Sequence, residues 1–164
     1  MNRKQFLSTL SAAGLALALM PAGVALAQQQ SISSKEFQAL SGHVPTEAAP
    51  GKIEVVEFFW YGCPHCYAFD PTISSWSKRK PEDVVFRRVH VPFSSRPHQQ
   101  MFYALQAIGR EDDDTRNLIF DAIQKQRKPM QQLDEMKEVL AAAKVDPKAF
   151  ENAYNSFGVK TQIQ

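Results

Sequence analysis

Apolar residues fall into one long leading run, two short runs and then a series of helical repeats. The segment Leu10–Leu26 is almost entirely small and apolar, and it follows the basic pair Arg3 and Lys4. Ala25-Leu26-Ala27 has the small-x-small form of a signal-peptidase site. A proline and a glycine interrupt the run, which is shorter than the ~20 apolar residues of a membrane span. The pattern therefore predicts a cleaved secretory signal over residues 1–27.

The two short runs are rich in β-branched and aromatic residues and predict two buried strands. Residues 28–51 form a polar arm, with a short strand or turn expected near Leu40, and Ile53–Trp60 is the first strand. Val84–Val91 is the second strand. Pro64–Lys80 lies between them with helical spacing, and Pro71 is expected to kink or break this helix. Strand, helix and strand in this order predict a parallel pair joined by a right-handed crossover.

Every periodic segment after the second strand is helical. Three have apolar residues at a spacing of three and four, and a fourth begins at Pro147 behind the N-cap Asp146 and continues through Phe157. The first three are His98–Ile108, Thr115–Lys125 and Leu133–Ala143. The chain is therefore predicted to be α/β, with a strand-helix-strand unit over residues 52–95 and a helical segment over residues 96–164.

The balance of charged residues and the number of cysteines exclude some functions once the predicted signal is left out of the count. The 19 basic residues include two in the signal, so the remaining 137 residues carry 17 basic and 17 acidic side chains. A neutral chain of this length predicts one domain with a sizeable core and offers no basic surface for nucleic acid. Two cysteines are too few for a scaffold held together by disulfides.

Cys63-Pro64-His65-Cys66 contains both cysteines and lies at the start of a predicted helix. A sulfur at a helix N-terminus has a lowered pKa, and two cysteines at this spacing can cycle between dithiol and disulfide. Cys63 is the predicted nucleophile, stabilised as thiolate by helix N–H groups and by protonated His65. Pro64 sets the backbone of the first turn. Cys66 is the predicted resolving thiol, which lies deeper and attacks Cys63 in a mixed disulfide.

Two other interpretations of the cysteine pair remain open: an inert disulfide and a metal site. Zinc prefers four ligands. Besides the two sulfurs the chain offers only four scattered histidines, which are His43, His65, His90 and His98. No metal is therefore expected.

For the charged and aromatic residues near the cysteines, the sequence predicts which are buried, which are solvated and which face a substrate. Alternation along the first strand places Glu57 on its apolar face and Glu54 on the opposite, solvated face. Trp60 or Tyr61 is expected to face a substrate. The pair Arg87-Arg88 lies near the end of the second strand and is expected to be solvated. His90 and His98 are expected to have structural roles and not to bind a ligand.

Lys52 to Cys66 closely resembles the active-site stretch of DsbA-type thiol:disulfide interchange proteins, which are periplasmic enzymes with a thioredoxin fold interrupted by helices. The resemblance implies that the Cys63–Cys66 disulfide is donated to reduced exported proteins and is renewed by a quinone-linked membrane reoxidase of DsbB type. It implies no cofactor beyond this disulfide. It also implies that Glu57 is a semi-buried acid that assists proton transfer at Cys66.

The sequence departs from this family after the helices. The expected fold is thioredoxin-like with a helical insert, but without the family's cis-proline loop, last strands and final helix. A catalytically impaired fragment of such an enzyme therefore remains an alternative, as does a disulfide reductase or isomerase.

Overall fold

The computed structural model describes residue 35, residues 37–42 and residues 44–163. The predicted signal at 1–27, much of the arm at 28–51 and His43 lie outside these residues. The chain divides into two units, Met1–Val44 and Pro45–Gln164. The described residues of the first unit are irregular and exposed and include no strand near Leu40, whereas the second unit contains every helix and strand described below.

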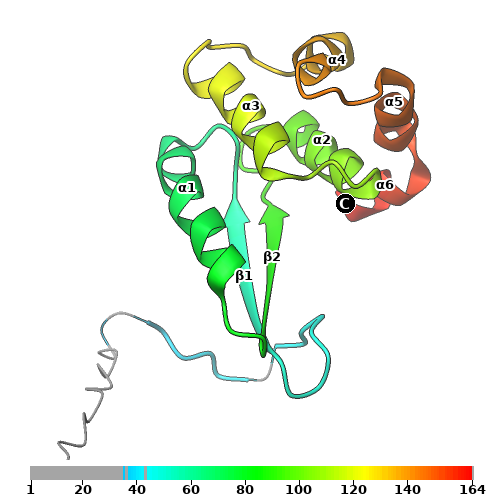
Figure 1. Ribbon diagram of the computed structural model, residues 1–164. Helices are drawn as coiled ribbons and strands as arrows, with labels where there is room; N and C mark the ends of the chain where they lie inside the picture. Colours follow the sequence, from blue (N-terminus) through cyan, green and yellow to red (C-terminus); the bar gives the residue numbers. More distant parts are fainter. Residues whose placement is uncertain (1–34, 36, 43, 164) are drawn as a thin grey trace, which may run out of the picture. The chain divides into compact units, whose positions relative to one another are not determined.

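The second unit has the predicted order of elements. Strand β1 (Ile53–Phe59), helix α1 (Pro64–Arg79) and strand β2 (Val84–His90) come first, and β1 and β2 pair in parallel. Five helices follow: α2 (Arg96–Ala107), α3 (Asp113–Gln124), α4 (Leu133–Ala141), α5 (Pro147–Asn155) and α6 (Phe157–Gln162). Figure 1 shows these helices gathered beyond the carboxyl ends of the two strands, with α3 beside α1. None of the helices in the described part of the chain is both long enough and apolar enough to span a membrane.

Side-chain caps explain where several of the later helices begin. Ser95, Asp112, Asp146 and Ser156 each accept the backbone N–H of the residue three positions later. Ser156 both ends α5 and caps α6, so the prediction of a single helix from Pro147 through Phe157 was wrong. Phe157 begins α6 and is 86% exposed.

Helix α1 continues past Pro71 without the break that the sequence predicted as one outcome. Proline removes one N–H from the helical ladder, but residues on both sides of it are held by packing. Tyr67 packs on the core before the proline, and the Trp76 ring lies 5.6 Å from the Phe86 ring after it. The tertiary contacts therefore outweigh the local defect.

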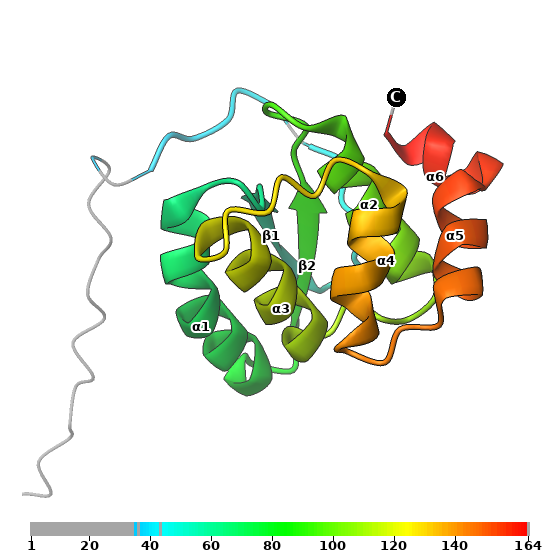
Figure 2. The ribbon, with the colours of Figure 1, turned by 90° about the horizontal axis from the view of Figure 1, so that it is seen from above.

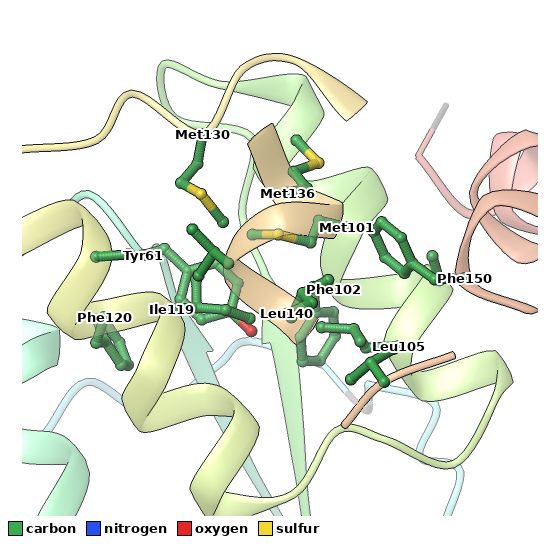
Figure 3. Packing of buried hydrophobic residues seen from close by; sticks show 14 of the residues in the cluster. Tyr61, Met101, Phe102, Leu105, Ile119, Phe120, Met130, Met136, Leu140 and Phe150 are labelled. Atoms are coloured by element: carbon green, nitrogen blue, oxygen red, sulfur yellow. The ribbon is translucent and has the colours of Figure 1, made fainter. Parts of the chain in front are cut away.

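The core joins the end of β1 to the helices, as Figure 3 shows for rings and aliphatic side chains from α2, α3, α4 and α5. Phe59 is only 2% exposed, and its ring contacts those of Tyr61, His90 and Phe102 at centroid distances of 5.1 to 5.3 Å. Edge-to-face contacts of this kind stabilise a core beyond the area that they bury. The core therefore holds the segment that leads directly to Cys63.

Candidate active site

Cys63 is the N-cap of α1, as the sequence predicted. Its extended backbone (φ −85°, ψ 115°) lets its Sγ accept the N–H of Cys66 at 3.3 Å. Pro64 occupies the first helical position, where its missing N–H has no partner to lose. The Cys63 N–H donates to the Trp60 carbonyl at 3.0 Å, which closes the turn before the helix. Local backbone hydrogen bonds thus hold the Cys63 sulfur at the start of α1.

The pKa values of the two thiols are shifted in opposite directions. Burial works against the Cys63 thiolate, but hydrogen bonds from the Cys66 thiol and from the N–H groups of Cys66 and His65 outweigh it and lower the Cys63 pKa. Burial raises the pKa of Cys66, and the adjacent Cys63 and Glu57 raise it further. Cys66 also packs against the core. The site therefore holds one thiol poised to ionise beside one that keeps its proton.

His65 contributes to this asymmetry through its backbone. Its N–H is one of the groups that stabilise the Cys63 sulfur, while its side chain is exposed. The backbone donors at the start of α1 therefore stabilise the thiolate in this structure, and an effect of the imidazole itself stays a prediction.

Glu57 lies inside the fold, on the face that alternation predicted. Its side chain is 12% exposed, and Arg88 Nε donates to its Oε2 at 2.8 Å. Burial raises the pKa of Glu57, and the charge of Arg88 opposes this rise. The β1–β2 register places Glu57 directly opposite Arg88. The charge of this partly buried carboxyl group is also one of the causes that raise the pKa of Cys66.

The prediction that Arg88 and Glu54 are solvated was wrong, whereas the Arg87 side chain remains 30% exposed. Arg88 is 8% exposed and lies 4.9 Å from the centre of the Phe86 ring. Arg87 donates to Glu54 Oε1 at 2.9 Å, and the Glu54 side chain is only 6% exposed. The reason is the parallel register, which brings the charges of one strand beside those of the other.

Tyr61 does not face a substrate. It is fully buried, so that half of the prediction was wrong, while Trp60 is partly exposed. Trp60 lies over Gly62, where a Cβ would come within 2.1 Å of the indole ring. Only glycine therefore fits at position 62 with the indole held beside Cys63.

An apolar hollow of about 250 Å³ lies beside the cysteines. Its lining residues are Phe58, Phe59, Trp60, Cys63, Pro64, Cys66, Val91 and Phe93. Phe58 is 68% exposed and Phe93 is 82% exposed, with the Phe93 ring 5.6 Å from that of Trp60. The sequence interpretation assigned Phe58 to the core and did not single out Phe93. Strict alternation next to the buried Phe59 was the available signal for Phe58, whereas Phe93 lies in a loop that has no periodicity.

His90 and His98 are buried and make hydrogen bonds within the fold. The Tyr61 N–H donates to His90 Nε2 at 3.3 Å, and the Gln124 amide donates to the Tyr61 carbonyl at 2.8 Å. His98 Nε2 lies 2.9 Å from the Pro129 carbonyl. Both sides of the Tyr61 peptide are thus fixed, two residues before Cys63. Within residues 37–42 and 44–163, no three side chains of the usual ligand types converge on a possible metal site.

The burial of His90 predicts a loss of stability in acid. Burial lowers its pKa to about 3, whereas an unfolded histidine titrates near 6.5. Above about pH 6.5 this histidine does not lower the free energy of unfolding. As the pH falls from about 6.5 towards 3 the free energy of unfolding decreases, because the unfolded chain binds a proton at this position more tightly than the folded chain does. Between about pH 7 and 5, the free energy of unfolding in urea should fall by about 2 kcal/mol more in the wild type than in His90→Gln. Equal losses in the wild type and in His90→Gln would contradict the assignment.

A parallel strand-helix-strand unit with a dithiol at the helix start is the redox unit of a thioredoxin-like protein. Comparison with known proteins agrees. A family model described as a DSBA-like thioredoxin domain matches residues 54–164. The chain therefore belongs to the family of DsbA-like thioredoxin domains.

Individual relatives show the same similarity. The chain is 45% identical over 144 residues to the thiol:disulfide interchange protein DsbA of Pseudomonas aeruginosa, covering 87% of this chain and 67% of that protein. It is 48% identical to DsbA of Azotobacter vinelandii over 79% of this chain, but spans only 61% of that relative. The crystal structure of P. aeruginosa DsbA superposes with a TM-score of 0.72 at 44% identity, covering 79% of this chain and 71% of that one.

Proposed function

We propose that this protein is a thiol:disulfide oxidoreductase that donates the Cys63–Cys66 disulfide to reduced proteins exported to the periplasm. The observation that carries the proposal is the position of Cys63 at the N-cap of α1, where its Sγ accepts the Cys66 N–H at 3.3 Å next to a second thiol. Hydrogen bonds at this position lower the pKa of Cys63, whereas burial raises that of Cys66. A stabilised Cys63 thiolate favours the reduced form of the protein, which makes its disulfide a strong oxidant. DsbA proteins are a known example of this rule, and the relatives described above carry that name.

The reaction follows from the positions of the two sulfurs. A substrate thiolate attacks Cys63 Sγ, the Cys63–Cys66 bond breaks, and Cys66 leaves as a thiolate that takes a proton from Glu57 or from water. A second substrate thiolate then attacks its own partner sulfur and displaces Cys63. The substrate gains a disulfide and loses two electrons, while the protein gains them as two thiols. Cys63 is the better leaving group because its pKa is lowered.

The apolar hollow is the proposed substrate-binding surface. Trp60, Phe58 and Phe93 border it next to Cys63. An unfolded polypeptide exposes apolar side chains near its cysteines, and exposed aromatic rings offer large contact areas at low entropic cost. Such a surface favours unfolded proteins in general over one particular sequence.

The remaining parts of the proposal concern location and renewal of the disulfide. The predicted signal at residues 1–27 favours export to an oxidising compartment. A quinone-linked membrane reoxidase of DsbB type would return the dithiol to the disulfide, and no further cofactor is needed because the cysteines carry the electrons.

The test is the absorbance of the reduced protein at thiolate wavelengths as a function of pH. A transition well below the free-cysteine value of ~8.5, absent from Cys63→Ser, is expected. Equilibration with glutathione should then give a potential well above that of a reductant such as thioredoxin, which lies near about −270 mV. A transition at the ordinary value would indicate a catalytically impaired protein, and a low potential would indicate a reductase or isomerase.

A further inference from the structure

The two residues of α1 that are buried are both polar. They are Asp70 and Ser74, which are 3% and 7% exposed, while Phe69 on the same helix is 49% exposed. Helix α3 lies beside α1 in both ribbon views, and Figure 2 shows the two helices next to each other from above. A buried aspartate is costly unless hydrogen bonds or an opposite charge compensate it.

Arg116 of α3 supplies that cation and is 1% exposed. Its Nε donates to Asp70 Oδ1 at 2.7 Å, and its Nη2 donates to Ser74 Oγ at 2.8 Å. On its other side it pairs with Glu111 at 2.8 Å and with Asp113. Burial works to lower the pKa of Arg116, but the neighbouring carboxylates outweigh it and hold that pKa above its ordinary value. Arg116 is therefore a permanent positive charge inside the protein.

The contacts of Arg116 lead on to Glu57 through shared partners. Arg88 Nη2 lies 3.6 Å from the Asp70 Oδ1 that Arg116 binds, and it donates to the same Ser74 Oγ at 3.0 Å. The other side of Arg88 binds Glu57 at 2.8 Å. Two arginines and two carboxylates thus alternate between α3 and β1. Because Arg116 binds Asp70 more closely, Arg88 is left to neutralise Glu57.

We propose that Arg116 is a positioning residue for the redox reaction, because by neutralising Asp70 it keeps Arg88 paired with Glu57 and so favours the carboxylate form of Glu57 near Cys66. The inference rests on the proposed function. It concerns the step in which Cys66 passes its proton to the Glu57 carboxylate and attacks Cys63 Sγ in a mixed disulfide. The new Cys63–Cys66 bond forms, the mixed disulfide breaks, and the partner sulfur leaves as a thiolate.

The groups that face Glu57 come from three elements. Arg88 faces it from β2, Asp70 and Cys66 from α1, and Arg116 from α3. Loss of Arg116 leaves Asp70 with Arg88 as its nearest cation, so that Arg88 is shared and Glu57 stays protonated to higher pH. On the acidic side of the pH profile Glu57 is then protonated and cannot accept the proton of Cys66.

The experiment mixes the reduced protein with glutathione disulfide, quenches with acid and separates the species by mass spectrometry. The first step, attack by Cys63, gives the glutathionylated protein, and the second, attack by Cys66, gives the intramolecular disulfide. Arg116→Gln should slow the second step about fivefold on the acidic limb and leave it unchanged on the alkaline plateau. The first step should follow the wild-type profile, because it does not use Glu57.

Three variants separate positioning from folding. Asp70→Asn combined with Arg116→Gln removes one charge of each sign and should restore the wild-type profile, and Arg116→Lys should restore it in part. Arg110→Gln is the matched control, since Arg110 binds Asp112 and two backbone carbonyls away from Glu57. A profile of Arg116→Gln that superimposes on the wild type would overturn the inference. So would a double variant as slow as the single one, because the loss would then be one of folding.

Glu57→Gln distinguishes failure of the inference from failure of the proposed function. It should reproduce the slow acidic limb, and adding Arg116→Gln to it should change nothing further. If Glu57→Gln has no effect while both steps remain fast, the inference is overturned and the oxidoreductase function stands. Absence of both steps in the wild type would overturn the proposed function itself.

Discussion

Cys63→Ser is expected to lower the rate of disulfide transfer to a reduced test protein by about three orders of magnitude or more. Cys63 supplies the sulfur at the N-cap of α1, where the N–H of Cys66 points at Sγ. A serine hydroxyl does not ionise at neutral pH and cannot form the disulfide. The measurement is the rate at which a reduced, unfolded protein regains its disulfides and activity in the presence of a stoichiometric amount of oxidised chain.

Cys66→Ser is the informative partner of this variant. It also cannot donate a disulfide, but it keeps the activated Cys63. We expect it to react with glutathione disulfide and to remain glutathionylated, because no second thiol displaces the glutathione. Rapid loss of the mixed disulfide from Cys66→Ser, or glutathionylation of Cys63→Ser as fast as that of Cys66→Ser, would reverse the roles assigned to the two sulfurs.

Phe59→Ala is expected to lower the free energy of unfolding by about 3 to 5 kcal/mol. The ring is 2% exposed and meets aromatic rings from the β1–α1 turn, β2 and α2. Removing it leaves a cavity where the strands join the helices. Small domains have only about 5 to 15 kcal/mol of stability in total. The variant should therefore unfold at a much lower urea concentration than the wild type.

Phe58→Ala is the matched control for this loss. It changes the same residue type at the neighbouring position, but that ring is 68% exposed and borders the apolar hollow. Its free energy of unfolding should lie within about 0.5 kcal/mol of the wild-type value. Equal destabilisation by the two substitutions would show that Phe59 is not the centre of the core.

The local part of the site could be predicted from the sequence. Cys63 comes directly before Pro64, and a proline at the first helical position places the preceding residue at the N-cap. This is decided by neighbours in the chain. The inward direction of Glu57 follows for a similar reason, because side chains alternate along a strand.

The charges around Glu57 could not be predicted in the same way. Arg88 and Arg116 look like surface residues in the sequence, and nothing near them indicates a partner. Their burial depends on the β1–β2 register and on α3 lying beside α1. Glu57 meets Arg88 because the register sets them opposite each other, and a shift of one residue would turn one of the two side chains to the other face.

The position of Trp60 also makes the tryptophan fluorescence of the protein sensitive to the oxidation state of the cysteines. The chain has two tryptophans, and only Trp60 lines the hollow that contains both sulfurs, while Trp76 packs against Phe86. Gly62 has no side chain to displace the indole, since a Cβ there would lie 2.1 Å from the ring. A nearby disulfide quenches indole emission by accepting an electron, whereas two thiols do not. The brightness of the native protein should therefore report its oxidation state in real time, without any label.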